Sequence, residues 1–172
     1  MKYSTFPVGI GTVLFLSLVL SGCGIRSIPT ALNEVEAAWS EVLNQYKRRS
    51  DLIPNLVNIV KGYAAHEKET LLAVVDARAK ATQTQVNTNQ LTPESLRQFS
   101  QAQAGLGSAL SRLMVVVERY PDLKANENFR DLQVQLEGTE NRITVARYRY
   151  IQSIKGFNNL ITVPPESWYN SW

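Results

Sequence analysis

The chain has 172 residues but only one cysteine and one histidine. A single cysteine excludes an internal disulfide, and it excludes zinc fingers and iron–sulfur clusters, which need several cysteine ligands. The net charge is only +3, and basic and acidic residues are interleaved along the chain, so no nucleic-acid partner is indicated. The length predicts one domain, which at this size folds without disulfides.

Recognisable catalytic motifs are also missing. The stretch HEKET begins like a zinc-protease HExxH motif, but Thr70 stands where the second histidine is required, and His66 is the only histidine. No Gly-x-Ser-x-Gly elbow is present. The stretch AGLGSAL lies inside a helical pattern, so Gly105 and Gly107 are expected to allow close helix packing. We therefore expect no enzyme, no metal and no small-molecule substrate.

The one cysteine, Cys23, follows an apolar run at the N-terminus. Lys2 provides a short positive region, and residues 6–20 are almost wholly apolar. This run is too short to cross a hydrocarbon core of ~30 Å comfortably, and it is typical of a secretory signal peptide. The tetrapeptide LSGC, residues 20–23, resembles the lipobox of bacterial lipoproteins. The alternative is an incidental cysteine at the end of an uncleaved anchor.

The lipobox implies a lipid-anchored protein. Residues 1–22 would be a cleaved lipoprotein signal peptide, and residues 23–30 a tether whose Cys23 carries a covalent diacylglycerol and an N-acyl chain. One acyl chain anchors only marginally, whereas two or three anchor stably. The mature chain would then lie outside the cytoplasm on a membrane of the cell envelope. Gly24 replaces the Asp of an inner-membrane retention signal, which favours the outer membrane in a Gram-negative organism.

The sequence pattern of the rest of the chain predicts long amphipathic helices. Apolar residues recur in steps of three and four, and no alternating strand pattern occurs. This spacing over residues 31–163 therefore predicts an all-α fold. The expected architecture is an elongated antiparallel up-and-down four-helix bundle. Thr92 and Asn126 are expected to cap helices, and Tyr120 to end one before a proline. The predicted inward residues include Leu32, Val35, Trp39, Val42, Tyr46, Ile53, Leu56, Val60, Tyr63, Leu71, Val74, Val75, Phe99, Leu106, Leu110, Leu113, Val117, Phe129, Leu132, Leu136, Ile143, Tyr150, Ile154, Phe157 and Ile161. Whether Pro54 kinks or breaks the first helix stays open.

Two clusters are candidate contacts with a partner or a membrane. The basic cluster is Lys47, Arg48 and Arg49, and the aromatic tail, residues 164–172, contains Trp168, Tyr169 and Trp172. The basic cluster is either a solvated helix face or a contact for anionic head groups or an acidic partner. The tail either folds back on the bundle or engages a membrane interface or a partner. The same ambiguity holds for Arg142, Arg147, Arg149 and Lys155.

Two long blocks resemble the LemA family. They are AAWSEVLNQYKRRSDLIPNLVNIVKGYAAHEKETL, residues 37–71, and VVVERYPDLKANENFRDLQVQLEGTENRI, residues 115–143. Family members are envelope-associated helical bundles, commonly with an N-terminal transmembrane helix, and no catalytic activity is well established for them. The resemblance implies a bundle outside the cytoplasm. The chain departs from the family pattern in its lipobox and in its short, Trp-rich C-terminus.

The leading functional hypothesis is a lipid-anchored, non-enzymatic interaction or scaffold module of the cell envelope, with other envelope proteins as partners. An alternative is an amphipathic bundle that acts directly on the lipid bilayer. A second alternative is an unrecognised envelope hydrolase, for which His66 is the most obvious base. The sequence names no partner, oligomeric state or physiological process.

Overall fold

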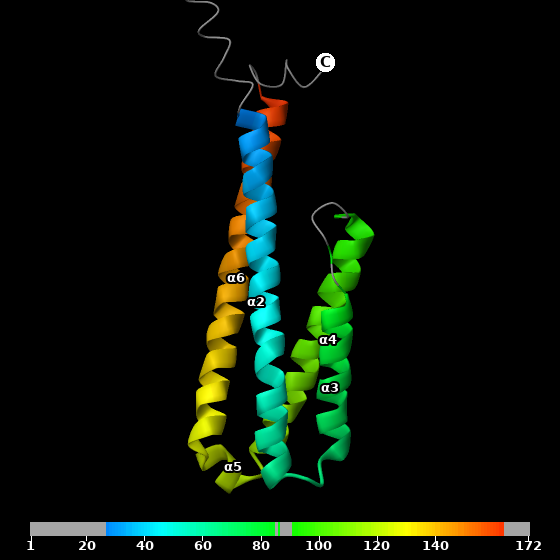
Figure 1. Ribbon diagram of the computed structural model, residues 1–172, viewed down its shortest axis with the longest axis vertical. Coiled ribbons are helices and arrows are strands. Elements are labelled where there is room, and N and C mark those ends of the chain that lie inside the picture. Colours follow the sequence, from blue (N-terminus) through cyan, green and yellow to red (C-terminus); the bar gives the residue numbers. More distant parts are fainter. Residues whose placement is uncertain (1–26, 85, 87–90, 164–172) are drawn as a thin grey trace, which may run out of the picture. The chain divides into compact units, whose positions relative to one another are not determined.

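The computed structural model describes residues 27–84, 86 and 91–163, and within these ranges the chain forms five helices and no strand. The helices are α2 (Ser27–Tyr63), α3 (Lys68–Gln83), α4 (Pro93–Val117), α5 (Pro121–Ala125) and α6 (Glu127–Thr162) (Figure 1). The all-α prediction is confirmed. The chain divides into a large unit, Trp39–Tyr148, and a terminal unit whose described residues are 27–38 and 149–163.

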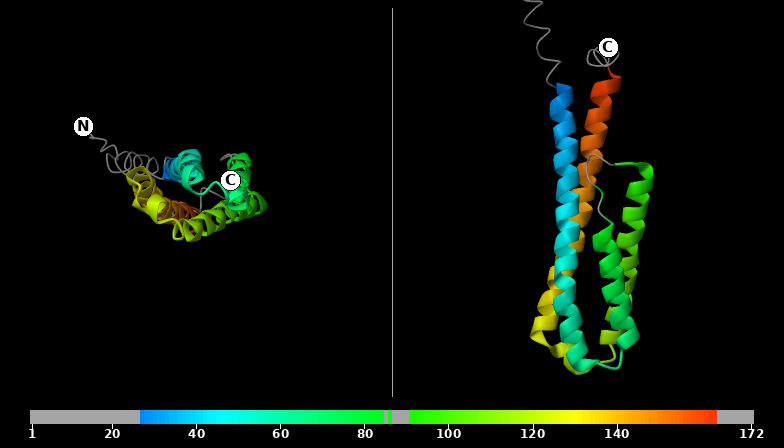
Figure 2. Two further views of the ribbon diagram at one scale, coloured as in Figure 1. Left: turned by 90° about the horizontal axis from the view of Figure 1, so that it is seen from below. Right: turned by 45° about the vertical axis from the view of Figure 1, so that its right-hand side comes forward.

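The large unit is a helical bundle. Its segments of α2, α3, α4 and α6 alternate in direction, as Figure 1 and Figure 2 show, and α3 packs along α4. Apolar side chains at helical spacing fill its interior because burying each one stabilises the fold by roughly 1.5–3 kcal/mol. The most deeply buried side chains include Val42, Ile53, Leu56, Val60, Val74, Leu106, Leu113, Leu123 and Phe129.

Most of the predicted inward positions lie in this core, but some do not. Val75, expected to point inward, is 45% exposed. The interior positions of α3 are Leu71, Val74 and Ala81, which places Val75 at the edge of the buried face. Tyr63, in the last turn of α2, is also 45% exposed.

Pro54 lies inside α2 and does not end it. A proline has no N–H, so the carbonyl four residues earlier loses its helical partner. That carbonyl belongs to Ser50, and it accepts a hydrogen bond of 2.8 Å from Nε of Arg78 on α3. The open question is thus answered in favour of a continuous helix, in which a side chain from α3 bonds the carbonyl that Pro54 leaves free.

The helix ends follow the capping chemistry that the sequence predicts. Thr92 caps α4, accepting a hydrogen bond of 3.1 Å from the Ser95 N–H, and Pro93 follows it. Asn126 Oδ1 accepts from the Phe129 N–H at 3.0 Å and caps α6. The expected helix end at Tyr120 is displaced: α4 ends at Val117, and Pro121 begins the short helix α5.

The described residues of the terminal unit form the first part of α2 and the last part of α6, followed by Val163. The clearly buried side chain among them is Ala31, whereas Leu32, predicted to point inward, is 44% exposed. Tyr150, Ile154 and Phe157 are half-buried, and burial raises the pKa of Tyr150. Helix α2 begins at Ser27, within the segment expected to be a tether, because a proline such as Pro29 is tolerated in a first helical turn.

Candidate functional site

A buried arginine from α2 is the most unusual feature of the large unit. Arg49 is 4% exposed, and its guanidinium bridges to α4 and α6. Nη1 donates to Glu140 Oε1 at 2.5 Å, and Nη2 donates to Gln103 Oε1 at 2.6 Å and to the Gln103 carbonyl at 3.3 Å. Its Nε is buried without a partner. An arginine side chain is always charged, so these partners are what allow it to be buried.

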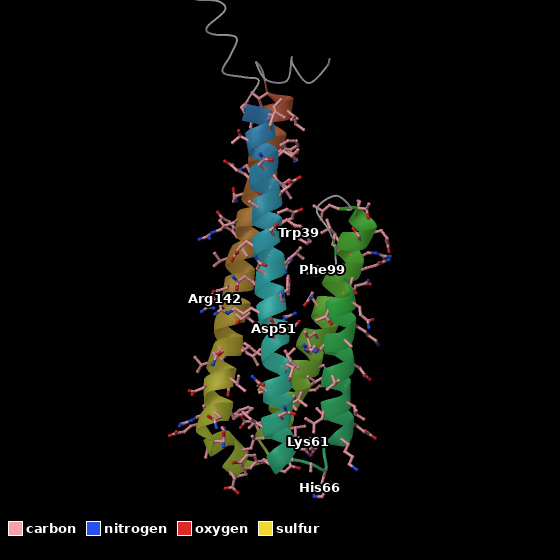
Figure 3. The ribbon with its side chains drawn as sticks, viewed as in Figure 1. Trp39, Asp51, Lys61, His66, Phe99 and Arg142 are labelled. Atoms are coloured by element: carbon pink, nitrogen blue, oxygen red, sulfur yellow. The ribbon has the colours of Figure 1, made fainter. Side chains whose placement is uncertain are left out.

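Aromatic side chains surround this arginine. The guanidinium carbon lies 5.0 Å from the centre of the Tyr46 ring, a cation–π distance. Tyr46 and Trp39 each pack edge-on against Phe99 of α4, with ring centres 5.1 and 5.6 Å apart. Trp39 Nε1 donates to the Val86 carbonyl at 3.1 Å, and Figure 3 shows Trp39 and Phe99 on facing helices. The cluster fixes α2 against α4.

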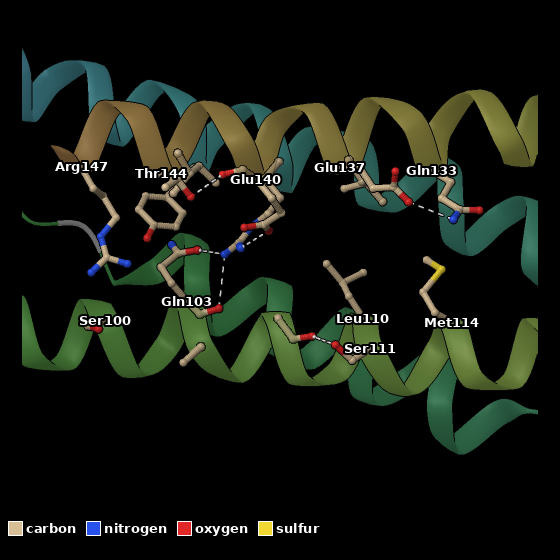
Figure 4. A pocket seen from close by; sticks show the side chains of 16 residues that line it. Ser100, Gln103, Leu110, Ser111, Met114, Gln133, Glu137, Glu140, Thr144 and Arg147 are labelled. Carbon is tan, nitrogen blue, oxygen red and sulfur yellow. Dashed lines mark hydrogen bonds and ion pairs between the residues drawn. The ribbon is translucent and has the colours of Figure 1, made fainter. Parts of the chain in front are cut away.

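Beside Arg49 a groove opens between α4 and α6 (Figure 4). We call it the lateral groove; its volume is about 510 Å³. Helix α2 contributes Tyr46 and Arg49 to its floor. The remaining lining residues are Ser100, Gln103, Ala104, Gly107, Leu110, Ser111 and Met114 from α4, and Gln133, Leu136, Glu137, Glu140, Ile143, Thr144 and Arg147 from α6. All of them belong to the large unit.

The two ends of the lateral groove carry opposite charges. At one end Arg147 is exposed and reaches from α6 toward α4 near Ser100 (Figure 4). Toward the other end Glu137 accepts a hydrogen bond of 3.0 Å from Gln133. Neither Arg147 nor Glu137 forms an ion pair within the described residues. Between them the Arg49–Glu140 ion pair is internally neutral, so the unbalanced charges lie at the ends.

Small residues of α4 face the lateral groove at spacings of three and four: Ser100, Ala104, Gly107 and Ser111. The expectation that Gly105 and Gly107 allow close packing of helices within the chain is wrong. A Cβ built at either position meets nothing within 4 Å. Gly105 is exposed, and Gly107 opens into the lateral groove.

The residues that line the lateral groove do not form an arrangement suited to acid–base catalysis. It contains two carboxylates, but that of Glu140 is paired with Arg49. His66 does not line the groove; it is exposed in the turn between α2 and α3 (Figure 3). Ser111 Oγ donates to the Gly107 carbonyl at 3.0 Å. No nucleophile and base are therefore joined by a hydrogen bond among the groove residues.

The basic cluster is split between surface and interior. Lys47 and Arg48 are exposed, whereas Arg49 is buried and held by Gln103 and Glu140. The Arg49 guanidinium is therefore not exposed on the outer surface of α2. Arg49 is adjacent to Lys47 and Arg48 in the sequence, but the helical repeat turns it to the inward face of α2. Lys47 and Asp51 line a second cavity of about 390 Å³ between α2 and α3.

The remaining predicted contacts lie outside the described residues: Cys23, Trp168, Tyr169 and Trp172. Over residues 27–84, 86 and 91–163, no helix combines the length and hydrophobicity needed to span a lipid bilayer. The same ranges contain no group of three or more acidic, His or Cys residues placed to hold a metal ion.

Gln103 and Glu140, the two partners of Arg49, were not predicted from the sequence. Gln103 was detectable because it stands in the apolar row of α4, between Phe99 and Leu106, and yet is polar. Glu140 is half exposed, and no local pattern distinguishes it from other charged residues of α6.

Comparisons with known proteins show the family of this chain. A model described as the LemA family matches residues 38–172. Magnetosome protein MamQ 1 of Paramagnetospirillum magneticum is 26% identical over 91% of this chain and 63% of that protein. Magnetosome protein MamQ of Magnetospirillum gryphiswaldense is 25% identical over 79% of this chain and 56% of that protein. Protein LemA of Metamycoplasma hominis is 25% identical over 90% of this chain and 71% of that protein.

The fold and the cavity together define an all-α bundle protein with a groove between α4 and α6. The family match covers most of the chain, and the chain belongs to the LemA family. It spans less than two thirds of the length of the MamQ relatives it matches.

Proposed function

We propose that this chain is a lipid-anchored interaction module of the bacterial cell envelope, fixed to a membrane through acylated Cys23. The observation that carries the proposal is the tetrapeptide LSGC at residues 20–23, directly after an apolar run and directly before the helical bundle. Two or three acyl chains give stable attachment, whereas one chain gives only marginal attachment.

The bundle supports an interaction role. It offers an open groove with charged ends, and among the groove residues no hydrogen bond joins a nucleophile to a base. A module of this kind holds a partner at the membrane surface, where the anchor confines both molecules and raises their effective concentration.

The anchor is tested by mass analysis of the protein recovered from membranes of its native organism. We expect the N-terminal residue to be Cys23 with a diacylglyceryl thioether and an N-acyl group, and we expect metabolic labelling with palmitate. Because the chain has a single cysteine, Cys23→Ser should abolish the thioether-linked label and release the protein from membranes.

A matched control separates the lipobox from thiol chemistry in general. In the Cys23→Ser background, Ser108→Cys places a new thiol at an exposed position of α4, and this variant should not acquire the label. Recovery of native protein with a free thiol and residues 1–22 still attached would overturn the proposal.

A second candidate function is direct action on the bilayer. The observation that favours it is a row of exposed apolar side chains on α6, Val134, Val145 and Tyr148, which are 67%, 42% and 63% exposed. The Cys23→Ser protein, which lacks acyl chains, should then bind anionic liposomes, and Val134→Ser with Tyr148→Ser should abolish that binding. If the Cys23→Ser protein does not bind such liposomes, this candidate is excluded.

A further inference from the structure

We propose that the lateral groove binds an amphipathic helix of a partner protein, with an acidic side chain of that helix against Arg147 and a basic one against Glu137. The inference rests on the proposed interaction role and names the surface and the chemistry of the partner. Three features of the groove carry it: its end charges, its neutral centre and its unfilled small-residue row.

The end charges set the spacing on the partner. Arg147 and Glu137 lie ten positions apart on α6, which is roughly 15 Å at the helical rise. Neither has an ion-pair partner within the described residues. A helix with opposite charges about three turns apart therefore satisfies both ends at once, and the charges determine its direction.

The centre of the groove tolerates being covered. Glu140 is 51% exposed, but its charge is already compensated by buried Arg49. A partner helix that shields this pair from water leaves no unpaired charge behind, which is the condition under which burying an ion pair is not strongly unfavourable. Leu110, Leu136 and Ile143 line the groove beside the pair, and Met114 adds an adaptable apolar surface.

The row of small residues on α4 provides room for a helix. Ser100, Ala104, Gly107 and Ser111 lie on the groove side, and no atom of residues 27–84, 86 and 91–163 fills the space where a Cβ of residue 107 would stand. A Cβ at Gly107 would meet no atom of the described residues within 4 Å, although glycine inside a helix costs roughly 0.5–1 kcal/mol relative to alanine. A second helix seated in the groove, with its apolar residues at steps of three and four, fills the space.

The test uses the full chain, purified from membranes into phosphatidylcholine nanodiscs, and four fluorescent helical peptides. All four peptides share one apolar stripe and differ at two positions three turns apart, which carry Glu and Lys, Glu and Glu, Lys and Lys, or Gln and Gln. We expect the Glu and Lys peptide to bind at least about fivefold more tightly than the others, the scale of one or two exposed ion pairs. A Glu and Lys peptide can match both groove ends by choosing its direction, so a peptide with the two charges exchanged is not a control. A peptide with two like charges mismatches one end in either direction and therefore serves as one.

Charge reversal should change the preferred peptide. Arg147→Glu makes both groove ends acidic, so the Lys and Lys peptide should become the tightest binder. Glu137→Lys makes both ends basic and should favour the Glu and Glu peptide. Arg142→Glu and Asp131→Lys, at exposed positions of α6 that do not line the groove, should leave the original order unchanged.

Two glycines give a matched steric control. Gly105→Leu and Gly107→Leu add the same side chain to the same helix at sites with open space, so both variants should fold. Only Gly107→Leu projects into the lateral groove, and it should weaken peptide binding at least about tenfold while Gly105→Leu does not.

The proposal is overturned if no peptide binds, if the order ignores the end charges, or if both glycine variants behave alike. It is also overturned if Gly107→Leu instead dissociates a dimer in sedimentation, which would make a second copy of this chain the occupant. The Cys23→Ser protein should bind the peptides as tightly as the native chain. Failure of the anchor and failure of the groove are therefore seen in different measurements.

Discussion

At the scale of single residues, Arg49 is a buried charge of α2 that links this helix to Gln103 of α4 and Glu140 of α6. Trp39, Val42 and Tyr46 of α2 follow one another in steps of three and four, and the same steps lead through Arg49 to Ile53. This spacing places Arg49 on the inward face of α2, although the sequence prediction grouped it with Lys47 and Arg48 as a contact for a partner or a membrane. Its partners could not be predicted because Glu140 lies 91 residues away in the chain, and amphipathic spacing carries no information about which helix faces which.

Removal of Glu140 should be more harmful than removal of the arginine itself. Glu140→Ala leaves the buried guanidinium of Arg49 without its anionic partner, and we expect the free energy of unfolding to fall by about 1–3 kcal/mol. Arg49→Met removes the buried charge and leaves only neutral acceptors of Gln103 without their donor, so it should lower the free energy of unfolding by less than Glu140→Ala does. Urea denaturation of the Cys23→Ser protein followed by circular dichroism measures both.

The double variant and an exposed arginine serve as controls for this prediction. Arg49→Met combined with Glu140→Ala should recover most of the stability lost in Glu140→Ala, since the unpaired charge is gone. Arg142→Ala, on an exposed site of α6, should change stability by less than about 0.5 kcal/mol. If Glu140→Ala is as stable as the native protein, Arg49 does not depend on this ion pair.

At the scale of elements, the two blocks that resemble the LemA family map onto contacts between helices. In the first block Pro54 frees the Ser50 carbonyl, which Arg78 of α3 then bonds. In the second block the Tyr120 hydroxyl donates to Glu67 at 3.1 Å. Burial raises the pKa of Tyr120, and the nearby Glu67 carboxylate raises it further. The caps of α4 and α6 were readable locally, whereas these tertiary contacts were not.

The pairing of Pro54 with Arg78 is testable by a double-mutant cycle. Arg78→Met leaves the buried Ser50 carbonyl without its side-chain donor and should lower the free energy of unfolding by about 1–3 kcal/mol. Pro54→Ala restores an N–H that can bond Ser50 within α2. In the Pro54→Ala background the cost of Arg78→Met should therefore be smaller, with a coupling energy of at least about 0.5 kcal/mol. Additive effects would show that the Arg78 bond does not depend on the missing N–H.

At the scale of the whole molecule, the sequence predicted one bundle over residues 31–163, and the structure divides the chain into two units. The apolar rows of α2 and α6 continue along helices of 37 and 36 residues, whereas α3 and α4 have only 16 and 25. Spacing alone marks one face of each helix as apolar along its whole length, without showing how many neighbours that face has. Among its described residues, the terminal unit contains segments of two helices, α2 and α6.

This difference in helix number predicts a difference in local stability between the units. In the large unit Ile53, Leu56 and Val60 are fully buried, whereas Ala31 is the clearly buried side chain among the described residues of the terminal unit. Short helical segments with little tertiary packing are marginal in water, and local opening is easiest where few apolar contacts are buried. Amide hydrogens of residues 27–38 and 149–163 should therefore exchange with deuterium at least about tenfold faster than those of residues 50–60. Mass spectrometry of the Cys23→Ser protein in the absence of lipid measures the rates. Equal protection of both units would contradict the expected difference, because a terminal unit as stable as the large unit needs buried apolar surface beyond that of its described residues.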